Sequence, residues 1–500
     1  MSRLRWGLAT ALLLTFIVYA RLVSSYFCGF DDFTNEYRAA FEDSPNPSRV
    51  FTTTHFGGTK YRPFNRGAVL LCYWLTPDSA LAHRLRNLLA HLVSVILVFA
   101  VARRLGATQT ESLFAATLFG LHPLAHQSTA AAIFGVNFAY AFTLAALWMF
   151  LEAYESRGAR MFSFLAGSSL TACIALLTYE PAIAVFGLYG VYCFWRWMRG
   201  EAPVAGLYQF GAPFLVSQIV PLAIFIGTRF MFVAERTPIV PLGIIIKNIA
   251  IFASALILPV DLLLLNSLFG TPLPNQALSD QELVLTIAAV GLLIAVALGI
   301  WILRSAETRR RIGGLPWWAL LFLLCGIGFA LVPFLVFTDH ASETYAYLPA
   351  AFWSIILAII VGRVAPPGPA YRVVAGALLV LAAAAAWMRT DRVRHCAAVA
   401  EHIVTSVPRE AWKSPSSTVF FADAPGTPPL EKFGLYGYRG IATIDPGDPA
   451  FPALEQALRL RFHNTELKAA PVSPARLGSL CATPGDACYL VDENGAVTQP

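Results

Sequence analysis

Two adjacent carboxylates follow the first apolar segment of the chain. Asp31 and Asp32 lie in the stretch FDDFTNEY, directly after the apolar residues 6–27. A carboxylate held near an acceptor hydroxyl can act as a general base and take its proton while the oxygen attacks. Aspartate is also favoured at the start of a helix, where it accepts backbone N–H donors. The pair is therefore predicted either to transfer a proton or to cap a helix.

A basic residue follows in the same loop. Arg62 lies in YRPF, where Pro63 stiffens the backbone beside it. A guanidinium held in place can bind a phosphate through paired N–H donors. Arg62 is therefore a predicted phosphate ligand, and contact with lipid head groups is the alternative.

A histidine and asparagine pattern opens the next apolar segment. His83, Asn87 and His91 are four residues apart, so they share one face of a helix. Three roles are open: hydrogen bonds between helices, lining of a donor-binding cavity, and metal ligation, since histidines at this spacing can bind zinc. No third metal ligand lies nearby in the sequence, so structural hydrogen bonding ranks first and metal last. No cofactor is indicated with certainty, and a divalent metal stays open.

Two further polar residues stand directly before prolines. His122 precedes Pro123, and Glu180 precedes Pro181. Proline disfavours helix for the residue before it, so both side chains are predicted to lie at breaks between apolar helices. Ionisable groups near the membrane are costly and usually mark a functional path. Both residues are therefore candidate substrate-binding residues.

The composition places all of these residues in a membrane protein. Of 500 residues, 57% are hydrophobic and 13% are charged, and the mean hydropathy is +0.61. These values are too apolar for a soluble protein of this size. The net charge of +6 is therefore no sign of nucleic-acid binding, because basic residues in a membrane protein mostly set its topology.

Apolar segments of about 20 residues, long enough to span a bilayer, recur through residues 1–388. Eleven are predicted to span: 6–27, 84–102, 111–126, 131–151, 160–178, 181–198, 206–228, 283–303, 316–337, 345–363 and 371–388. A further segment, 244–266, contains Pro259 and Asp261 and is predicted to be re-entrant, interfacial or broken. The predicted fold is an α-helical polytopic membrane protein with a long first outer loop, 28–83.

Basic residues give the orientation. Arg3 and Arg5 place the N-terminus in the cytoplasm. The next basic pairs then occupy short inner loops: Arg103 with Arg104, Arg157 with Arg160, and Arg196 with Arg199. Eleven spans put the C-terminus outside the cytoplasm.

With this orientation, many ionisable residues fall on the outer side. They are Asp31, Asp32, His55, Lys60, Arg62, His122, His126, Glu180, Asp339, His340 and Glu343. Glu343 and Tyr345 lie at the outer entrance of the segment 345–363, where tyrosine is also a common interfacial anchor. The concentration of these groups on one side predicts an outward-facing site.

Several of these segments, in this order, resemble one family. The carboxylate pair, YRPF and H-x-x-x-N-x-x-x-H are similar to motifs of the polytopic GT-C glycosyltransferases, above all the membrane part of the tetratricopeptide-repeat O-mannosyltransferases and their bacterial relatives. LFGLHPLAHQSTAAAIFGVN resembles the family's His-Pro segment, LLTYEPAIA its Ser-Lys-Glu segment, and HASETYAYLPAAF its Glu-Arg-Tyr-Leu-Tyr-Leu-Pro segment. The matches cover about residues 1–390, without the repeats.

The resemblance implies an enzyme of the cell inner membrane that transfers a sugar, with inversion, from a polyprenyl phosphate to a glycan, lipid or protein outside the cytoplasm. It implies that Asp31 or Asp32 is the general base. It also implies a set of donor-binding residues: Arg62, His83, Asn87, His122, Glu180, Glu343 and Tyr345. Two alternatives remain open, a lipid-linked glycan flippase or transporter and a catalytically inactive GT-C-like scaffold.

The chain departs from the family pattern at several charged positions. A neutral residue replaces a basic or acidic one at Ala125, Gln127, Val136, Asn137, Tyr179 and Thr344. These replacements leave the phosphate ligands and the donor sugar open, and they are the reason to retain the scaffold alternative.

The composition changes from about residue 389. STVFFAD and CYLVDENGAVTQ predict strands, the second with an Asn-Gly turn, and PALEQALRLRFHN predicts a short amphipathic helix. Residues 389–500 are therefore predicted to form a small α/β or α+β domain outside the cytoplasm. Cys481 and Cys488 flank a turn-prone insert and can pair in an oxidising compartment, as can Cys28 and Cys72.

Overall fold

The computed structural model describes most of the chain. The described residues are 2–28, 30–54, 60–130, 132–133, 135–232, 240–257, 306–336, 343–364, 369–408, 410, 418–424, 453–472, 474–481, 487–492 and 496–500. The predicted span 283–303, most of the second half of 244–266, and His55, Asp339 and His340 lie outside these residues.

The chain is an α-helical polytopic membrane protein, as predicted. Among the described residues, seven helical segments are long and apolar enough to cross a membrane: Leu81–Arg104, Val136–Tyr154, Gly158–Thr178, Leu207–Phe232, Trp317–Phe334, Glu343–Val364 and Tyr371–Ser406. They contain the helices α5 (Leu81–Arg104), α8 (Val136–Tyr154), α9 (Gly158–Thr178), α11 (Leu207–Phe232), α16 (Trp317–Leu331), α17 (Tyr347–Val364) and α18 (Pro369–Ser406).

Shorter helices complete the bundle. They are α1 (Ser2–Ala20), α6 (Gln109–Gly120), α10 (Ala184–Met198) and α12 (Leu242–Ile257). Helix α6 begins at a capping box, in which Thr108 accepts from the Glu111 backbone N–H and the Glu111 side chain accepts from that of Thr108. Ten of the eleven predicted spans are therefore helical in the part of the chain that the structure describes.

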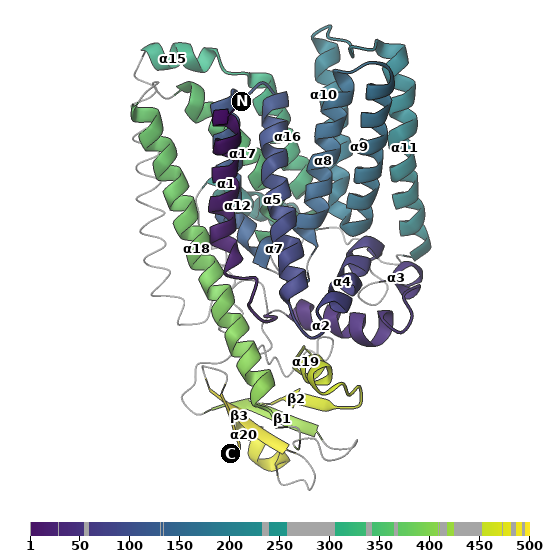
Figure 1. Cartoon of the computed structure of the whole chain (residues 1–500), viewed down its shortest axis with the longest axis vertical. Coiled ribbons are helices and arrows are strands. Elements are labelled where there is room, and N and C mark those ends of the chain that lie inside the picture. The colour runs from purple at the N-terminus through teal and green to yellow at the C-terminus, as the bar shows by residue number, and fades with distance from the viewer. Residues whose placement is uncertain are drawn as a thin grey trace.

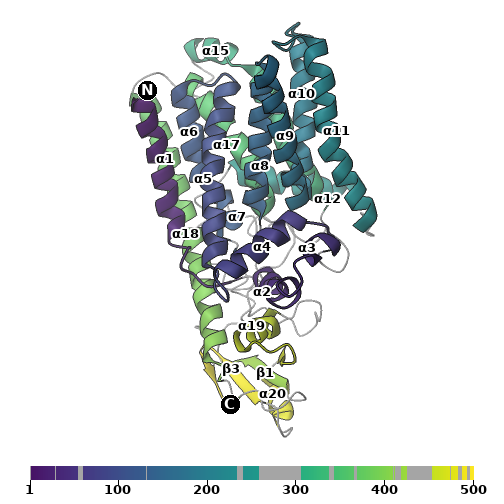
Figure 2. The same ribbon diagram turned by 45° about the vertical axis from the view of Figure 1, so that its right-hand side comes forward.

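The helices run up and down between two ends of the bundle (Figures 1 and 2). One end, at the top of Figure 1, holds the N-terminus, α15 (Ala306–Gly313) and the connections from α5 to α6, α8 to α9 and α10 to α11, which carry the basic pairs. We call this the arginine end. The other end holds α2 (Phe30–Arg38), α3 (Arg49–Thr52), α4 (Pro63–Leu75) and the C-terminal strands. We call it the α2 end.

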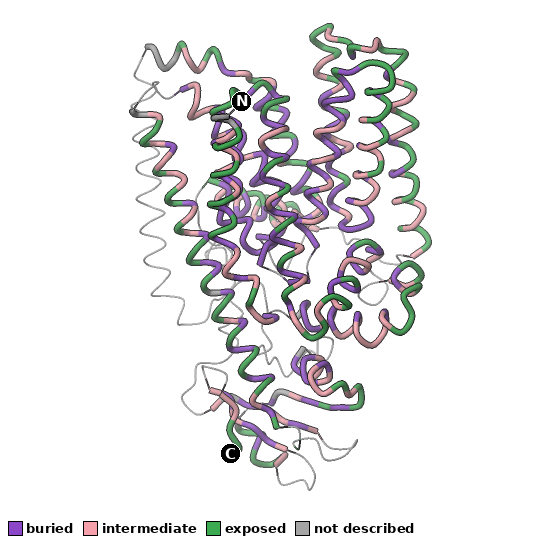
Figure 3. The backbone as a smooth tube through the Cα atoms, viewed as in Figure 1, coloured by how far each residue is buried: buried purple, intermediate pink, exposed green. Residues whose placement is uncertain are grey.

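Burial follows the pattern of a membrane bundle (Figure 3). The inner faces of α5, α6, α8 and α17 form one core of buried apolar residues. Large apolar side chains on outer faces are exposed, such as Leu13 and Ile17 of α1 and Leu215 and Val216 of α11. Exposed apolar faces of this extent are expected where lipid covers the helices, because lipid tails are as apolar as the side chains.

The C-terminal region is a small sheet with two helices. Strands β1 (Thr418–Asp423), β2 (Lys468–Pro471), β3 (Ala487–Val491) and β4 (Val497–Thr498) lie in the order β2-β1-β3-β4. Strand β1 pairs in parallel with β2 and β3, and β4 is antiparallel to β3. Helices α19 (Ala453–Phe462) and α20 (Pro474–Leu480) complete it. The predicted strands and amphipathic helix are confirmed, and the Asn-Gly turn lies outside the described residues.

Helix α18 joins this region to the bundle. It continues without a break from the predicted span 371–388 to Ser406 (Figure 1). Its last turns place Val399, Ile403 and Val404 in one apolar core with strand β1 and helix α19. The connection between the bundle and the C-terminal strands is thus a helix whose end packs against those strands.

Candidate functional site

Asp32 lies at the start of α2 and is fully buried. Its Oδ2 accepts a hydrogen bond from the Cys28 backbone N–H at 3.2 Å, and its Oδ1 accepts one from the Ile133 backbone N–H at 3.1 Å. These bonds tie α2 to the end of the first apolar segment and to the loop between α7 (His126–Ala130) and α8. Asp31 is the preceding residue of α2, and its side chain lies outside the described part of the structure.

The loop between α7 and α8 is held by side chains from three directions. Besides Asp32, Asn65 of α4 accepts from the Gly135 backbone N–H at 3.2 Å. From α5, Asn87 donates to the Ala132 carbonyl at 3.2 Å. Arg86 of α5 also donates to the Ala132 carbonyl, and Arg84 donates to the carbonyl of Ala130, the last residue of α7. The loop therefore fixes α2, α4 and α5 relative to one another, and it accounts for the buried position of Asn87.

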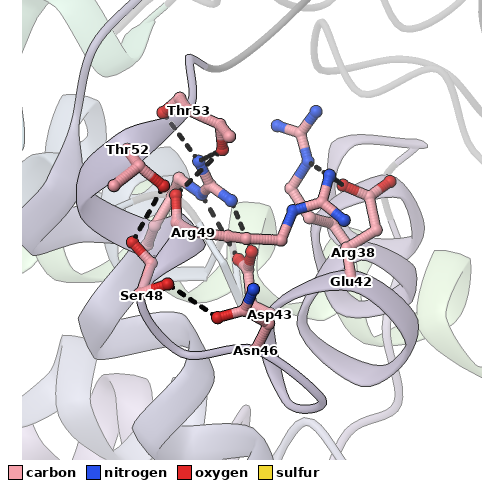
Figure 4. Close-up of polar contacts among 9 residues, drawn as sticks. Arg38, Glu42, Asp43, Asn46, Ser48, Arg49, Thr52 and Thr53 are labelled. Atoms are coloured by element: carbon pink, nitrogen blue, oxygen red, sulfur yellow. Dashed lines mark hydrogen bonds and ion pairs between the residues drawn. The ribbon is translucent and has the colours of Figure 1, made fainter.

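The segment 28–83 has an ion pair of its own, and its acid, Asp43, is labelled in Figure 4. Arg66 of α4 pairs with Asp43, and both side chains are almost fully buried. Arg66 also donates to the Thr53 carbonyl at 2.8 Å and to the Thr53 hydroxyl at 2.6 Å. These bonds join three parts of the loop, so that the start of α4, where Arg62 stands, has a fixed position.

Arg62 and Glu180 form a bidentate pair between the segment 28–83 and the break between α9 and α10. Arg62 Nε donates to Glu180 Oε2 at 2.9 Å and to Oε1 at 3.1 Å, and Nη2 donates to Oε2 at 2.6 Å. The side chains are 8% and 16% exposed. Glu180 and Pro181 begin the 3-10 turn η4 (Glu180–Ile183), which is the break expected from the sequence.

Each member of the Arg62–Glu180 pair shifts the pKa of the other toward its charged form. Burial alone would raise the pKa of Glu180, but the charge and hydrogen bonds of Arg62 reverse this effect and hold that pKa below its ordinary value of 4.5. The charge of Lys60 acts in the same direction. Burial would likewise lower the pKa of Arg62, and Glu180 offsets this and raises it. Both groups are therefore ionised at neutral pH.

Aromatic rings surround the pair. The Arg62 guanidinium carbon lies 4.7 Å from the centre of the Tyr179 ring, a cation–π distance. Tyr345 stacks on Phe334 with ring centres 4.1 Å apart, and Phe334 stacks on Tyr179 at 6.2 Å. The segments around 62, 180, 334 and 345 thus meet at one place.

Glu343 belongs to a second ionic group. It begins the 3-10 turn η6 (Glu343–Ala346) and lies between Arg389 of α18, at 2.8 Å, and His126 of α7, at 2.9 Å. All three side chains are buried. His122 lies within electrostatic range of Glu343 and Arg389, and its Nδ1 accepts from the Leu124 backbone N–H at 3.2 Å. Since Tyr345 is two residues from Glu343, η6 connects this group to the Arg62–Glu180 pair.

His83 contacts a residue that the sequence motifs did not single out. Its Nε2 lies 2.9 Å from Oε2 of Glu36, and both side chains are fully buried. Glu36 is one helical turn after Asp32 in α2, so the spacing of acids in FDDFTNEY was the available signal. His91 contacts the Tyr347 hydroxyl at 2.7 Å and the Gly120 carbonyl at 3.2 Å, both deep in the bundle. Arg389 was also missed, because the sequence places it just past a predicted span.

The described residues contain no group of three or more His, Cys, Asp or Glu side chains placed to hold a metal ion. Cys481 and Cys488 form a disulfide with a Cα–Cα distance of 5.7 Å. Cys28 and Cys72 are buried free thiols.

Comparisons with known proteins give structural neighbours but no sequence relatives. No family model and no curated protein matches the chain. Its structure is similar to the apo form of the oligosaccharyltransferase of Archaeoglobus fulgidus, with 13% identity, a TM-score of 0.49, and coverage of 95% of this chain and 65% of that one. It is also similar to ArnT from Cupriavidus metallidurans bound to undecaprenyl phosphate, with 15% identity, a TM-score of 0.40, and coverage of 98% and 93%.

A third neighbour is the Pmt1-Pmt2 protein O-mannosyltransferase complex of S. cerevisiae bound to its sugar donor, the kind of enzyme that the sequence motifs resemble. The identity is 16%, the TM-score 0.36, and the coverage 46% of this chain and 33% of that one. The chain thus spans about a third of this neighbour and just under two thirds of the archaeal one. With every TM-score here below 0.5, function has to be argued from the residues of this chain.

Proposed function

We propose that this protein is a glycosyltransferase that moves a sugar from a polyprenyl-phosphate donor to an acceptor hydroxyl outside the cytoplasm, with inversion. The acceptor is a glycan, lipid or protein. In this proposal residues 1–388 form the membrane domain of an inner-membrane protein, the N-terminus is cytoplasmic, and residues 389–500 form an extracytoplasmic domain.

The observation that carries the proposal is the Arg62–Glu180 pair at the α2 end. Arg62 uses Nε and Nη2 on Glu180, and within the described residues its Nη1 donates to no partner. Nη1 therefore has two N–H groups left that can donate hydrogen bonds to the phosphate of the polyprenyl-phosphate sugar. Glu180 fixes the direction of the guanidinium, and Lys60 adds positive charge nearby. A cation held in this way can stabilise the charge that develops on a leaving phosphate.

The two aspartates then take different roles. Both oxygens of Asp32 accept backbone N–H donors, which supports a positioning role for this residue. We assign the general base to Asp31. Its carboxylate takes the proton of the acceptor hydroxyl while the acceptor oxygen bonds to the anomeric carbon. The bond from that carbon to the phosphate oxygen breaks, and the phosphate leaves with the bonding electrons toward Arg62. A single displacement of this kind inverts the anomeric centre.

The remaining predicted donor-binding residues fall into two groups. Tyr345 flanks the Arg62–Glu180 pair, and Glu343 and His122 belong to the neighbouring ionic group, so we assign these three to the donor-binding region. His83 and Asn87 hold α2 and the loop between α7 and α8, which supports a positioning role for both.

The test is incubation of the purified protein with a panel of polyprenyl-phosphate sugars, in which donor binding and sugar release or transfer are both measured. Asp31→Asn is expected to bind donor with unchanged thermal stability and to lose activity by about 100- to 10,000-fold, the usual contribution of a general base. Asp32→Asn is expected to lower the melting temperature as well, because a charged acceptor of two backbone N–H groups is lost.

The matched control is Asp391→Asn, which changes a carboxylate that is 61% exposed on α18. It is expected to leave donor turnover unchanged. If wild-type protein neither binds nor consumes any donor of the panel, the transferase proposal is wrong, and the scaffold and transport alternatives replace it.

A further inference from the structure

Helix α2, which carries the two aspartates, lies between the membrane bundle and the C-terminal region. We propose that helix α19 is a positioning element for the transfer reaction, and that the contact between Thr34 and Gln456 sets the place of the aspartates. The inference rests on the proposed function, because the position of α2 matters for catalysis only if an α2 carboxylate is the base.

The outer face of α2 packs on α19. The Thr34 hydroxyl donates to Gln456 Oε1 at 2.7 Å, a bond between residues 422 positions apart. Phe33 is fully buried in the core that also contains Leu454 and Leu458 of α19. The Arg459 guanidinium carbon lies 5.9 Å from the centre of the Tyr37 ring. One polar bond, an apolar core and a cation–π contact thus fix this face.

The inner face of α2 contacts the membrane domain. Asp32 and Glu36 are four residues apart, and both are fully buried against it, through Ile133 and His83 respectively. Helix α2 has nine residues and continues directly into the five-residue π-helix η1 (Ala39–Asp43). Isolated helices shorter than about 12–15 residues are marginal in water, so α2 depends on the elements that cover its two faces.

The C-terminal region is itself anchored to the membrane domain. Arg389 of α18 binds Glu343 at 2.8 Å inside the bundle, and the same helix reaches the core shared by α2 and α19 through Ile403 and Val404. In Figure 2, α19 lies directly below α2 at the end of this arm. A shift of α19 therefore acts directly on α2, whereas the Arg62 guanidinium is bonded to Glu180 of the bundle.

The experiment is a double-mutant cycle with Thr34→Val and Gln456→Leu, in the full-length protein and under the transfer assay. Each single variant is expected to lower kcat by about 10- to 100-fold, as for small misplacements of a catalytic group. The KM for the donor is expected to stay the same, because Arg62 keeps its bonds to Glu180 of the bundle. The double variant is expected to be no slower than the worse single one, and Thr34→Ser is expected to retain activity.

The matched control is Thr405→Val on α18, which removes an exposed threonine hydroxyl that bonds to backbone carbonyls of its own helix. It is expected to leave kcat unchanged. Equal kcat in wild type and both single variants would overturn the positioning role, as would losses that multiply in the double variant or that appear in donor KM.

A second measurement does not depend on turnover. Amide hydrogen exchange within residues 32–38 is expected to be faster in Thr34→Val and in Gln456→Leu than in wild type, and unchanged in Thr405→Val. Unchanged exchange in both Thr34→Val and Gln456→Leu would overturn the proposal that α19 holds α2 in place. If instead the wild type transfers no sugar but exchange responds as expected, α19 does hold α2 in place and only the proposed function fails.

Discussion

The two ends of the helix bundle both carry ion pairs, but they differ in how far these are buried. At the arginine end, Arg160 is 69% exposed and Arg199 is 51% exposed. Their partners differ, because Glu152 is buried in α8 and Glu201 is partly exposed. At the α2 end, Arg62 and Arg66 are 8% and 2% exposed. These two arginines of the arginine end are solvated, and the two of the α2 end are enclosed by protein.

The difference indicates what each set is for. Exposed pairs contribute about 0–1 kcal/mol each, so the ion pairs of these exposed arginines add little to stability. Burying an ion pair costs desolvation that its attraction does not always recover, so such pairs are weak evidence for stability. Buried pairs concentrated at one end of a membrane bundle therefore point to a site. Three predictions test this contrast, from the largest expected effect to the smallest.

The largest effect is expected when a cation is removed at each end. Arg62→Gln should lower sugar transfer by about 100- to 1,000-fold, the usual loss for one charge-stabilising donor. Arg160→Gln removes an arginine at the other end that lies 3.6 Å from Glu152, and it should leave transfer within about twofold of wild type. The measurement is initial rate with a saturating donor in the same detergent. Equal losses in the two variants would remove the functional distinction between the ends.

A smaller effect, on stability, is expected from removing an acid. Glu180→Gln leaves the Arg62 charge buried without its counter-ion, and breaking such a pair costs about 3–5 kcal/mol. Glu155→Gln breaks the 3.0 Å pair with Arg196 at the arginine end, where both groups are partly solvated, and should cost about 0–1 kcal/mol. Melting temperatures in detergent measure both.

Added inorganic phosphate should stabilise Glu180→Gln and wild type to different extents. It is expected to raise the melting temperature of Glu180→Gln more than that of wild type, because the unpaired Arg62 is then the better anion site. No difference between the two would argue against Arg62 as the phosphate ligand.

The smallest effect is expected at Glu36 and depends on pH. Burial, followed by the nearby charges of Asp78 and Asp32, raises the pKa of Glu36 well above its ordinary value of 4.5. The folded protein therefore keeps a proton that the unfolded chain releases above pH 4.5, so Glu36 costs stability as pH rises from there toward its folded pKa. Glu36→Gln removes this cost, which grows by about 1.4 kcal/mol per pH unit.

The melting temperature of Glu36→Gln should thus exceed that of wild type at pH 7 and equal it near pH 4. A variant that is less stable at pH 7 would mean that Glu36 is ionised and paired with His83, and the prediction would be wrong.

Much of the architecture follows from local sequence. Apolar runs predicted the bundle helices, and basic pairs such as Arg157 and Arg160 marked the connections at one end. Prolines predicted the breaks at His122 and Glu180. The end of α18 was not predicted, because the hydropathy signal stops near 388 while a polar helix leaving a membrane carries no such signal. Glu36 had no apolar or proline context to distinguish it from a loop acid.

By itself, the sequence determined the number and direction of most bundle helices and the side on which the polar residues gather. The physical reason is that a bilayer requires long apolar helices whose backbone groups bond within one segment. Each such helix can therefore be recognised from its own stretch of sequence. Only the tertiary structure decided the pairings: Arg62 with Glu180 across 118 residues, Glu343 with Arg389 across 46, and Thr34 with Gln456 across 422. Such contacts depend on how distant segments pack, and neither hydropathy nor spacing carries that information.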